Sequence, residues 1–213
     1  MSYLGNSFVA NPYVIESHDS WILTEKPAGL LSVPGKGPEK ADCLYSRLQR
    51  DFPDILVVHR LDQPTSGLMI WARNKEAQKK LGHQFEQRLI HKEYQALLSS
   101  GLPREEGGLE LRQRLDVDNR PLQIIDEEKG KLSLTRWRLL GEESGGHWRV
   151  QLYPETGRTH QLRLHMAAMK APILGDSLYG GPPFYRMALH ACVLEFLDPV
   201  SGCLRHFESV VPF

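Results

Sequence analysis

The sequence predicts an α+β fold in which a mixed, mainly antiparallel sheet forms two lobes flanked by helices and loops. Apolar segments with strand character outnumber the helical patterns. Near the end of the chain, Leu189–Leu197 and Leu204–Val210 surround an Asp-Pro-Val-Ser-Gly turn, as the arms of an antiparallel hairpin do. Strands and helices do not alternate regularly along the chain, so a parallel sheet built from βαβ units is not expected.

The strand predictions rest on short apolar runs bounded by turn-forming residues. Before the final hairpin, strands are expected at 21–24, 55–58, 68–72, 94–98, 132–139 and 147–153. In the last of these, Trp148, Val150 and Leu152 alternate with polar residues, which is typical of a strand with one buried face. Residues 99–131 are rich in turn formers and acidic side chains, and we predict an irregular segment there.

Three helices are expected, each from a capping residue followed by an apolar pattern. Asp42 is the expected cap of the first helix, which runs to about Arg50. Asn74 begins the second helix, whose apolar stripe has helical spacing: Ala77, Leu81, Phe85 and Leu89. Thr159 is the expected cap of the third helix, over residues 160–169.

The composition fits a single globular domain, which we expect at 21–213 after an irregular N-terminal arm at 1–20. The 213 residues are 41% hydrophobic and 24% charged, with 26 basic and 26 acidic side chains. The net charge of zero argues mildly against a nucleic-acid partner. However, residues 59–104 contain eight Lys/Arg against four Asp/Glu, so one region could meet phosphate groups; a mixed-charge surface is the simpler interpretation.

Nothing in the sequence indicates export or membrane insertion. The N-terminus has neither the basic nor the apolar segment of a secretory signal, and no apolar run approaches the roughly 20 residues of a membrane-spanning helix. The three cysteines, Cys43, Cys192 and Cys203, match no disulfide or metal spacing. We therefore expect a soluble cytoplasmic protein with reduced thiols.

The first segment that could carry chemistry is the polar loop His-Arg-Leu-Asp-Gln-Pro-Thr-Ser-Gly at residues 59–67, which joins two expected strands. Pro64 and Gly67 restrict its backbone, and loops held at the end of a sheet often carry functional side chains. A turn whose Asp and Thr side chains satisfy its own backbone would have the same composition. From the residues alone, both interpretations remain open.

The second segment is Thr-Gly-Arg-Thr-His-Gln-Leu-Arg-Leu-His at residues 156–165. The amides at the start of its helix favour an anion, and His160 and Arg163 share one helix face. A solvated basic face is the alternative. His160 and His165 are five residues apart, which does not match the HExxH zinc spacing, and Ser66 is not in a GxSxG elbow.

Four ordered motifs together resemble the RluA family of pseudouridine synthases. Residues 59–67 are similar to the family's loop with the invariant aspartate, at Asp62, and residues 26–30 resemble its upstream KPxG(L) motif. Lys92-Glu93-Tyr94 resembles its KxY segment, and residues 157–180 resemble its C-terminal motif. The short length and the segments around 31–37 and 47–53 are closest to the RluA branch, whose members act on both rRNA and tRNA.

The resemblance implies the pseudouridine synthase catalytic fold and an activity. The expected function is isomerisation of specific uridines in a tRNA anticodon stem-loop, in large-subunit rRNA, or in both. Asp62 would be the catalytic carboxylate, either as a nucleophile at C1′ or as a base at C2′. Arg163 would pair with Asp62 and favour its charged form, and Tyr94 would stack on the uracil.

The resemblance also implies how substrate is held. Arg60 would fill the space of a flipped-out base, and His59, Leu164 and Lys92 would contact the RNA. No cofactor or metal is required, because the reaction is a redox-neutral isomerisation. The expected partner of this monomer is RNA, not a membrane. The motifs begin by residue 26, so we expect no N-terminal RNA-binding domain of the S4 type.

Two other functions share part of this chemistry. A uracil-removing glycosylase also needs a carboxylate near C1′, but it would release free uracil. A catalytically silent RNA-binding protein would leave every uridine intact. The presence of Asp62, Tyr94 and Arg163 together favours the synthase over both.

Overall fold

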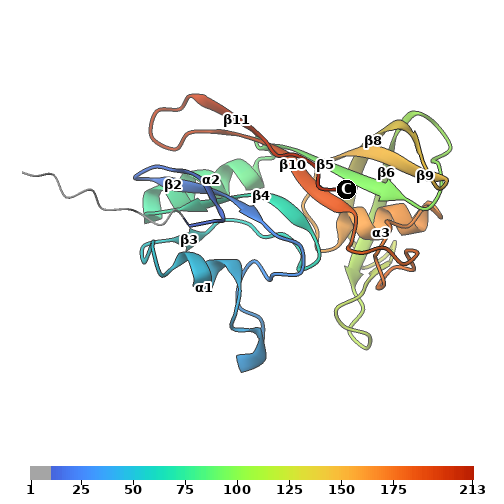
Figure 1. Cartoon of the computed structure of the whole chain (residues 1–213), viewed down its shortest axis with the longest axis horizontal. Helices are drawn as coiled ribbons and strands as arrows, with labels where there is room; N and C mark the ends of the chain where they lie inside the picture. Colours follow the sequence, from blue (N-terminus) through green and yellow to red (C-terminus); the bar gives the residue numbers. More distant parts are fainter. Residues whose placement is uncertain (1–10) are drawn as a thin grey trace, which may run out of the picture.

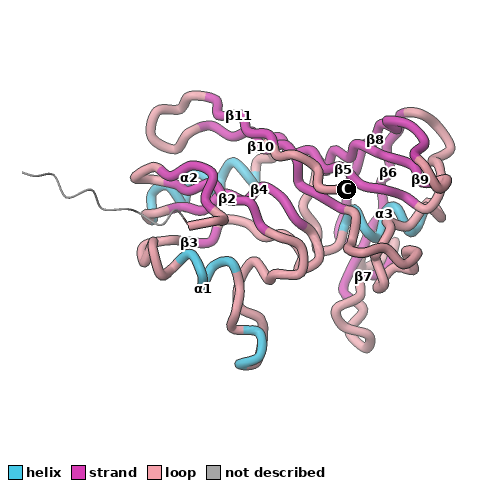
Figure 2. The backbone as a smooth tube through the Cα atoms, viewed as in Figure 1, coloured by secondary structure: helices cyan, strands magenta, loops and turns pink. Residues whose placement is uncertain are grey.

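The computed structural model describes residues 11–213. In these residues one sheet runs through the whole molecule, and the helices cover it at both ends (Figures 1 and 2). The elements in chain order are β1 (Val14–Ser17), β2 (Trp21–Lys26), η1 (Pro38–Lys40), α1 (Leu44–Leu48), β3 (Leu56–Val57), β4 (Ser66–Ala72), α2 (Lys75–Glu86), β5 (His91–Leu98), β6 (Glu106–Leu115), β7 (Gln123–Ile125), β8 (Lys131–Glu143), β9 (His147–Pro154), α3 (Gln161–Ala168), β10 (Leu189–Leu197) and β11 (Leu204–Glu208).

The strand order is β1-β2-β4-β10-β5-β9-β8-β6-β7, with β3 paired to β4 and β11 paired to β10. Among the described strands β4 and β10 form the one parallel pair, and every other pair is antiparallel. The prediction of an α+β fold with a mainly antiparallel sheet is therefore confirmed. The parallel pair matters for the site, because it joins the two ends of the sheet.

The first lobe is a layer of strands covered on both faces. Side chains of β2 and β4 pack alternately against α2 and against α1: Ile70 belongs to the cluster with Leu81 of α2, whereas Met69 belongs to the cluster with Leu44 of α1. Every residue of β4 is buried as a result. Burial on both faces explains why this strand is a continuous apolar run in the sequence without polar alternation.

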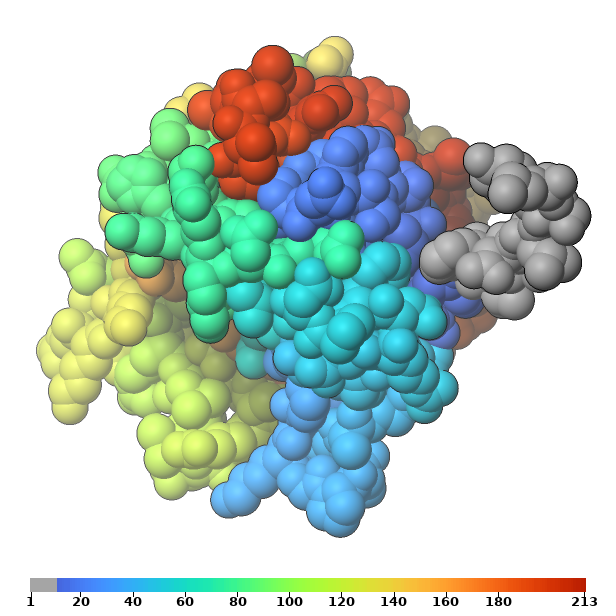
Figure 3. All heavy atoms as spheres, turned by 90° about the vertical axis from the view of Figure 1, so that its left-hand side faces the viewer, coloured from blue at the N-terminus to red at the C-terminus, as the bar shows by residue number. Residues whose placement is uncertain are grey.

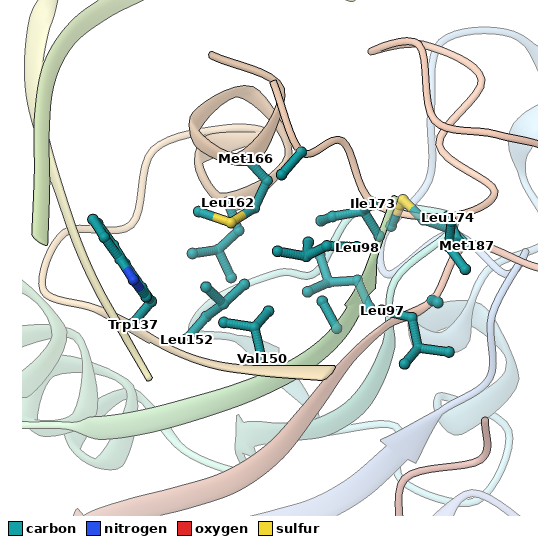
Figure 4. Close-up of a cluster of buried hydrophobic side chains, with 14 of the residues drawn as sticks. Leu97, Leu98, Trp137, Val150, Leu152, Leu162, Met166, Ile173, Leu174 and Met187 are labelled. Atoms are coloured by element: carbon teal, nitrogen blue, oxygen red, sulfur yellow. The ribbon is translucent and has the colours of Figure 1, made fainter. Parts of the chain in front are cut away.

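The second lobe has its core on one face only. Leu162 and Met166 of α3 point onto the strands, where they meet Val150 and Leu152 of β9 (Figure 4). The opposite side chains of β9 are polar, as the alternation in the sequence predicted. Tyr94 of β5 packs against the cores of both lobes, which places it at their junction.

Two segments project from the same edge of the molecule: the light-blue segment that includes η1, and the yellow-green end of the β6–β7 hairpin (Figures 1 and 3). Asp116 and Leu122 close this hairpin through a backbone hydrogen bond of 2.9 Å. The hairpin corrects the prediction of an irregular segment at 99–131. Its strands were missed because charged residues alternate with apolar ones in β6, so that no continuous apolar run marks the strand.

The structure corrects three boundaries. Strand β1 lies within the segment expected to be an irregular arm, whose residues 1–10 are outside the described part. The first helix is capped by Cys43 in place of Asp42. Helix α2 ends at Glu86, so Leu89 is exposed instead of completing the stripe. None of the helices in residues 11–213 is long and apolar enough to cross a bilayer.

Candidate active site

The loop that carries Asp62 is held by the loop after β2. Ser32 Oγ donates to the carbonyl oxygen of Leu61 at 2.7 Å and accepts from its N–H at 3.1 Å. The buried Lys26 ammonium donates to three carbonyl oxygens, those of Pro27, Leu30 and Gln63, at 2.9, 2.6 and 3.0 Å. These bonds fix the backbone on both sides of Asp62 without using its side chain.

Burial lowers the pKa of Lys26 to about 7, while the nearby charge of Asp62 acts in the opposite direction. The ammonium group has no access to solvent, so the three carbonyl oxygens replace its hydration shell. The KPxG segment thus acts as a support for the Asp62 loop, a role that the resemblance did not assign.

Gly67 brings the other end of the loop against the second lobe. It has a φ of +119°, and a Cβ at this position would lie 2.3 Å from the carbonyl oxygen of Ala191 in β10. Because β4 and β10 pair in parallel here, only glycine allows the two backbones to approach this closely. Asp62 therefore lies at the junction of the two lobes.

Arg163 reaches the same place from the first turn of α3 and is held there by Asp176. Its Nε and Nη2 each donate to one oxygen of Asp176 at 2.7 Å, which forms a bidentate salt bridge between two buried side chains. Its Nη1 donates to Asp62 Oδ2 at the longer distance of 3.4 Å. The guanidinium carbon also lies 5.2 Å from the centre of the Tyr179 ring. The structure thus brings Arg163 and Asp62 together, as the family resemblance implied, and Asp176 holds the guanidinium in place.

Tyr94 enters the site from β5, opposite Leu152 of β9. Burial raises the pKa of its phenol, and the charges of Asp62 and Cys192 raise it further. The hydroxyl is therefore protonated at neutral pH. The ring offers an aromatic surface beside Asp62, which is the property needed for stacking on a base.

These groups line a cleft with two connected parts. The polar lining of the inner pocket includes Asp62, Arg60, Lys92, Tyr94, His160 and Arg163. The outer groove shares Asp62 and Arg60 and adds residues near both projecting segments, such as Pro34 and Pro121. A chain entering between the projections would therefore meet Asp62 at the base of the groove.

The remaining predicted residues fall into two groups. Arg60 is exposed and lines both parts of the cleft, and Lys92 lines the inner pocket with its ammonium 5.9 Å from the centre of the Phe85 ring. His59 points away: its Nε2 accepts from the backbone N–H of Ile70 at 3.0 Å and its ring stacks on Phe85. Burial lowers the pKa of His59 to about 3, so the ring is neutral. These contacts give no support to the prediction that His59 binds substrate.

Leu164 is similarly placed away from the cleft. Its side chain is almost fully buried, and the residues of α3 that line the inner pocket beside Arg163 are Gln161 and Leu162. Helix α3 begins one residue later than predicted, and its N-cap is His160 in a left-handed conformation, with no side-chain cap from Thr159. The N-terminal amides of the helix were expected to favour an anion. The carboxylate of Asp62 lies at this end of the helix, 3.9 Å from the side chain of the N-cap residue His160.

Sequence reasoning missed three residues of the site: Asp176, Tyr179 and His160. All three belong to the quoted C-terminal motif, but no role was assigned to them. The signal was available in the composition of that motif, because a buried arginine needs a carboxylate partner and Asp176 is its only acidic residue. Spacing alone could not show that Asp176 folds back onto α3.

Within residues 11–213, no group of three His, Cys, Asp or Glu side chains has the arrangement of a metal site. What the cleft provides is one partly buried carboxylate, a guanidinium fixed beside it, and an aromatic ring. In this arrangement Asp62 Oδ2 faces Arg163, and Oδ1 forms no hydrogen bond with any described residue. Such a carboxylate is able to act on an electrophilic carbon or to take a proton.

Comparisons with known proteins agree with this chemistry. A family model described as RNA pseudouridylate synthase matches residues 20–168. A dual-specificity RNA pseudouridine synthase RluA from Vibrio vulnificus is 44% identical over 200 residues, covering 90% of this chain and 80% of the relative. The protein of the same name from Escherichia coli K12 is 38% identical, covering 94% and 93%. The structure of human RNA pseudouridylate synthase domain containing 1 superimposes with a TM-score of 0.78 at 28% identity, covering 94% of this chain and 84% of that chain.

Proposed function

Because this chain belongs to the RNA pseudouridylate synthase family, it is an isomerase that converts uridine in RNA to pseudouridine, and we propose that Asp62 supplies the carboxylate for the reaction. The observation that carries this assignment is the position of Asp62 in the cleft, where Oδ1 is free and Oδ2 is oriented by Arg163. The rigid backbone on both sides of Asp62 supports it further, since reacting groups must be held in place.

The reaction breaks the bond from uracil N1 to ribose C1′ and joins C5 to C1′, with no change in redox state. Asp62 acts either by attacking C1′, which forms and later breaks an ester, or by taking the C2′ proton, which forms a glycal. In both routes the carboxylate must be charged. Arg163 orients the carboxylate through its hydrogen bond, and Asp176 keeps the guanidinium in position.

Tyr94 has the position and protonation state of a stacking surface for the uracil ring. After the base has turned and C5 is bonded to C1′, the proton on C5 must leave. Burial raises the pKa of the phenol, so the hydroxyl stays protonated and can take this proton only if it first gives up its own. If Tyr94→Phe forms product at the wild-type rate in single turnovers, the hydroxyl is not the base and Tyr94 contributes its ring alone.

Arg60 and Lys92 are assigned to the RNA. A uridine within a stem or loop must leave the base stack to enter the inner pocket, at an energetic cost of a few kcal/mol. Arg60 is exposed at the point where the inner pocket meets the outer groove, so its guanidinium can occupy the vacated space. A fluorescent base analogue at the target should lose its flipping signal with Arg60→Ala, while Arg88→Ala, an exposed arginine that does not line the cleft, serves as the control.

The relatives that carry the name dual-specificity RNA pseudouridine synthase suggest more than one RNA substrate. We assign a tRNA anticodon stem-loop and large-subunit rRNA as the two classes. Contacts to RNA phosphates should make affinity fall with salt, although the net charge of zero predicts a shallow dependence. We further propose a cytoplasmic monomer, and the redox-neutral isomerisation requires neither a cofactor nor a metal.

The decisive experiment maps pseudouridine in tRNA and rRNA transcripts after incubation with the protein, through carbodiimide-dependent stops of reverse transcriptase. The wild type should produce stops at discrete uridines in both RNAs, and Asp62→Asn should produce none while keeping its melting temperature and its RNA affinity. Asp54→Asn is the matched control, because Asp54 is an exposed carboxylate bound to Arg73 outside the cleft.

The outcomes separate the parts of the proposal. Stops in only one RNA class would remove the dual specificity and leave the activity. Normal turnover by Asp62→Asn would remove Asp62 from the chemistry. Release of free uracil would indicate the glycosylase instead, which neither the family match nor the relatives favour.

A further inference from the structure

His160 occupies a position beside Asp62 for which the reaction scheme above has no use. It is the residue before α3, its side chain is 9% exposed, and it lines both parts of the cleft. Its Nε2 lies 3.9 Å from Asp62 Oδ2, and its Nδ1 lies 3.0 Å from the hydroxyl of Tyr179. The imidazole therefore lies between a half-buried tyrosine and the reacting carboxylate.

The hydrogen bonds around Tyr179 determine which nitrogen of His160 carries the proton. The backbone N–H of Gln123 can only donate, and it donates to the Tyr179 oxygen at 2.9 Å. The tyrosine proton then needs an acceptor, and Nδ1 of His160 is in reach. An accepting Nδ1 leaves the proton of the neutral ring on Nε2, the atom that faces Asp62.

Two further features support this assignment. Burial lowers the pKa of His160, so the neutral form is present at neutral pH. The Tyr179 ring meets the His160 ring edge-on, at a centroid distance of 5.7 Å, and its face carries the Arg163 guanidinium. One tyrosine thus fixes both groups that approach Asp62 Oδ2, and its own position is tied to β7 through Gln123.

We propose that His160 is a positioning residue for Asp62: its Nε2–H, set by the hydrogen bond from Tyr179, holds Oδ2 and leaves Oδ1 directed at the ribose. The inference rests on the proposed function of Asp62. The 3.9 Å separation is longer than a hydrogen bond. Hydrogen bonds of this kind are often long in the free enzyme and shorten when the substrate fills the site.

A simpler explanation for a residue here is its backbone. His160 has a φ of +54°, in the left-handed region that asparagine tolerates better than other residues with a side chain. If this conformation were the whole reason, Asn would replace His well and Gln would replace it poorly. A positioning role predicts the reverse order, because the longer glutamine amide can place an N–H near the site of Nε2, whereas the shorter asparagine amide cannot.

The test therefore compares His160→Gln with His160→Asn in single turnovers at saturating RNA. We expect His160→Gln to stay within about fivefold of the wild type and His160→Asn to be slower by about 10²-fold, the effect of a misplaced reacting group. RNA affinity should be unchanged in both variants. The melting temperature should follow the opposite order, with His160→Asn at least as stable as His160→Gln.

Tyr179→Phe gives an independent check, because it removes the hydroxyl and keeps the ring beneath Arg163. It should slow the wild type but add little to His160→Asn, since both changes break the same connection. Equal rates for the two His160 variants, or a faster His160→Asn, would overturn the inference. If the wild type itself formed no pseudouridine, the proposed function would fail first, so the two failures are distinguishable.

Discussion

The buried polar groups behind the cleft differ from those on its floor in how their hydrogen-bonding capacity is used. Asp176 behind the cleft accepts two bonds of 2.7 Å from Arg163 and a third of 3.2 Å from the backbone N–H of Leu178. Asp62 on the floor accepts one bond of 3.4 Å through a single oxygen. Both carboxylates contact the same guanidinium, so their difference lies in the remaining partners. Asp176 therefore serves the fold, whereas Asp62 can still accept hydrogen bonds from a substrate.

Asp176→Asn is expected to have the largest effect on stability. The change leaves the buried Arg163 without its charged partner, and removing one member of a buried pair typically destabilises a protein by about 3–5 kcal/mol. Activity should fall as well, because the guanidinium loses the group that orients it. Urea unfolding measures the first effect and single-turnover assays the second. Asp62→Asn is the matched control, with a stability change of about 1 kcal/mol or less; an equal loss in both variants would contradict the comparison.

Arg163→Lys sharpens the contrast from the other side. A lysine ammonium can still satisfy Asp176 as a point charge, but it cannot hold the two-point fork and reach Asp62 as well. Without the bond to Asp62 the reacting carboxylate is no longer held in place, and a misplaced reacting group lowers the rate by roughly 10–100-fold. The single-turnover rate should fall by that factor while RNA binding is retained. A rate close to that of the wild type would show that Arg163 serves only the fold.

The acid stability of the protein tests a second buried group whose hydrogen bonds are made within the protein, His190. Its Nδ1 lies 2.7 Å from Ser66 Oγ and its Nε2 lies 2.9 Å from Ser209 Oγ, and Arg186 also donates to Ser66. Burial lowers the pKa of His190 to about 4, with the charge of Arg186 acting in the same direction. The unfolded chain therefore binds a proton near pH 6.5, where the folded chain does not. The stability from this group is complete above about pH 6.5 and is lost as the pH falls towards 4.

At pH 5 the expected loss from His190 is ~2 kcal/mol. Urea unfolding at several pH values measures it, with His190→Gln as a non-titrating comparison that can bond to both serines. The free energy of unfolding of His190→Gln should be lower at pH 7 but should fall less between pH 7 and pH 5. His165, whose pKa burial lowers to about 4, continues to titrate in both proteins. Parallel slopes for the wild type and the variant would mean that His190 is protonated in the fold.

The sequence predicted what local patterns determine, and it missed what depends on contacts between distant segments. The continuous apolar run of β4 and the alternation in β9 were sufficient to place both strands. Strand β6 was missed because charged residues alternate with apolar ones along it, and β7 was missed because it has only three residues and is a strand through its pairing with β6. Cys43 displaced Asp42 as a cap because its thiol and the Ser46 hydroxyl form a capping box that composition does not suggest.

The site follows the same division. Asp62, Tyr94 and Arg163 were found through motifs, and the structure brings them together in one pocket. The support from Lys26 and Asp176 was not foreseen, because each contacts a residue from another segment of the chain. Lys26 meets Gln63, and Asp176 meets Arg163. His59 stands three residues before Asp62, yet its ring stacks on Phe85, so its predicted contact with RNA stays a prediction.

The smallest expected effect concerns an ion pair that resembles Arg163–Asp176 in composition but not in environment. Arg136 and Glu155 form a salt bridge on the face of β8 opposite the core residue Trp137, and the Arg136 side chain is 73% exposed. Water screens both charges, so Arg136→Ala should change the free energy of unfolding by about 1 kcal/mol or less and leave the rate of pseudouridine formation unchanged. A double-mutant cycle with Glu155→Ala measures the pair directly. A coupling as large as that between Arg163 and Asp176 would show that burial does not separate structural from incidental ion pairs in this fold.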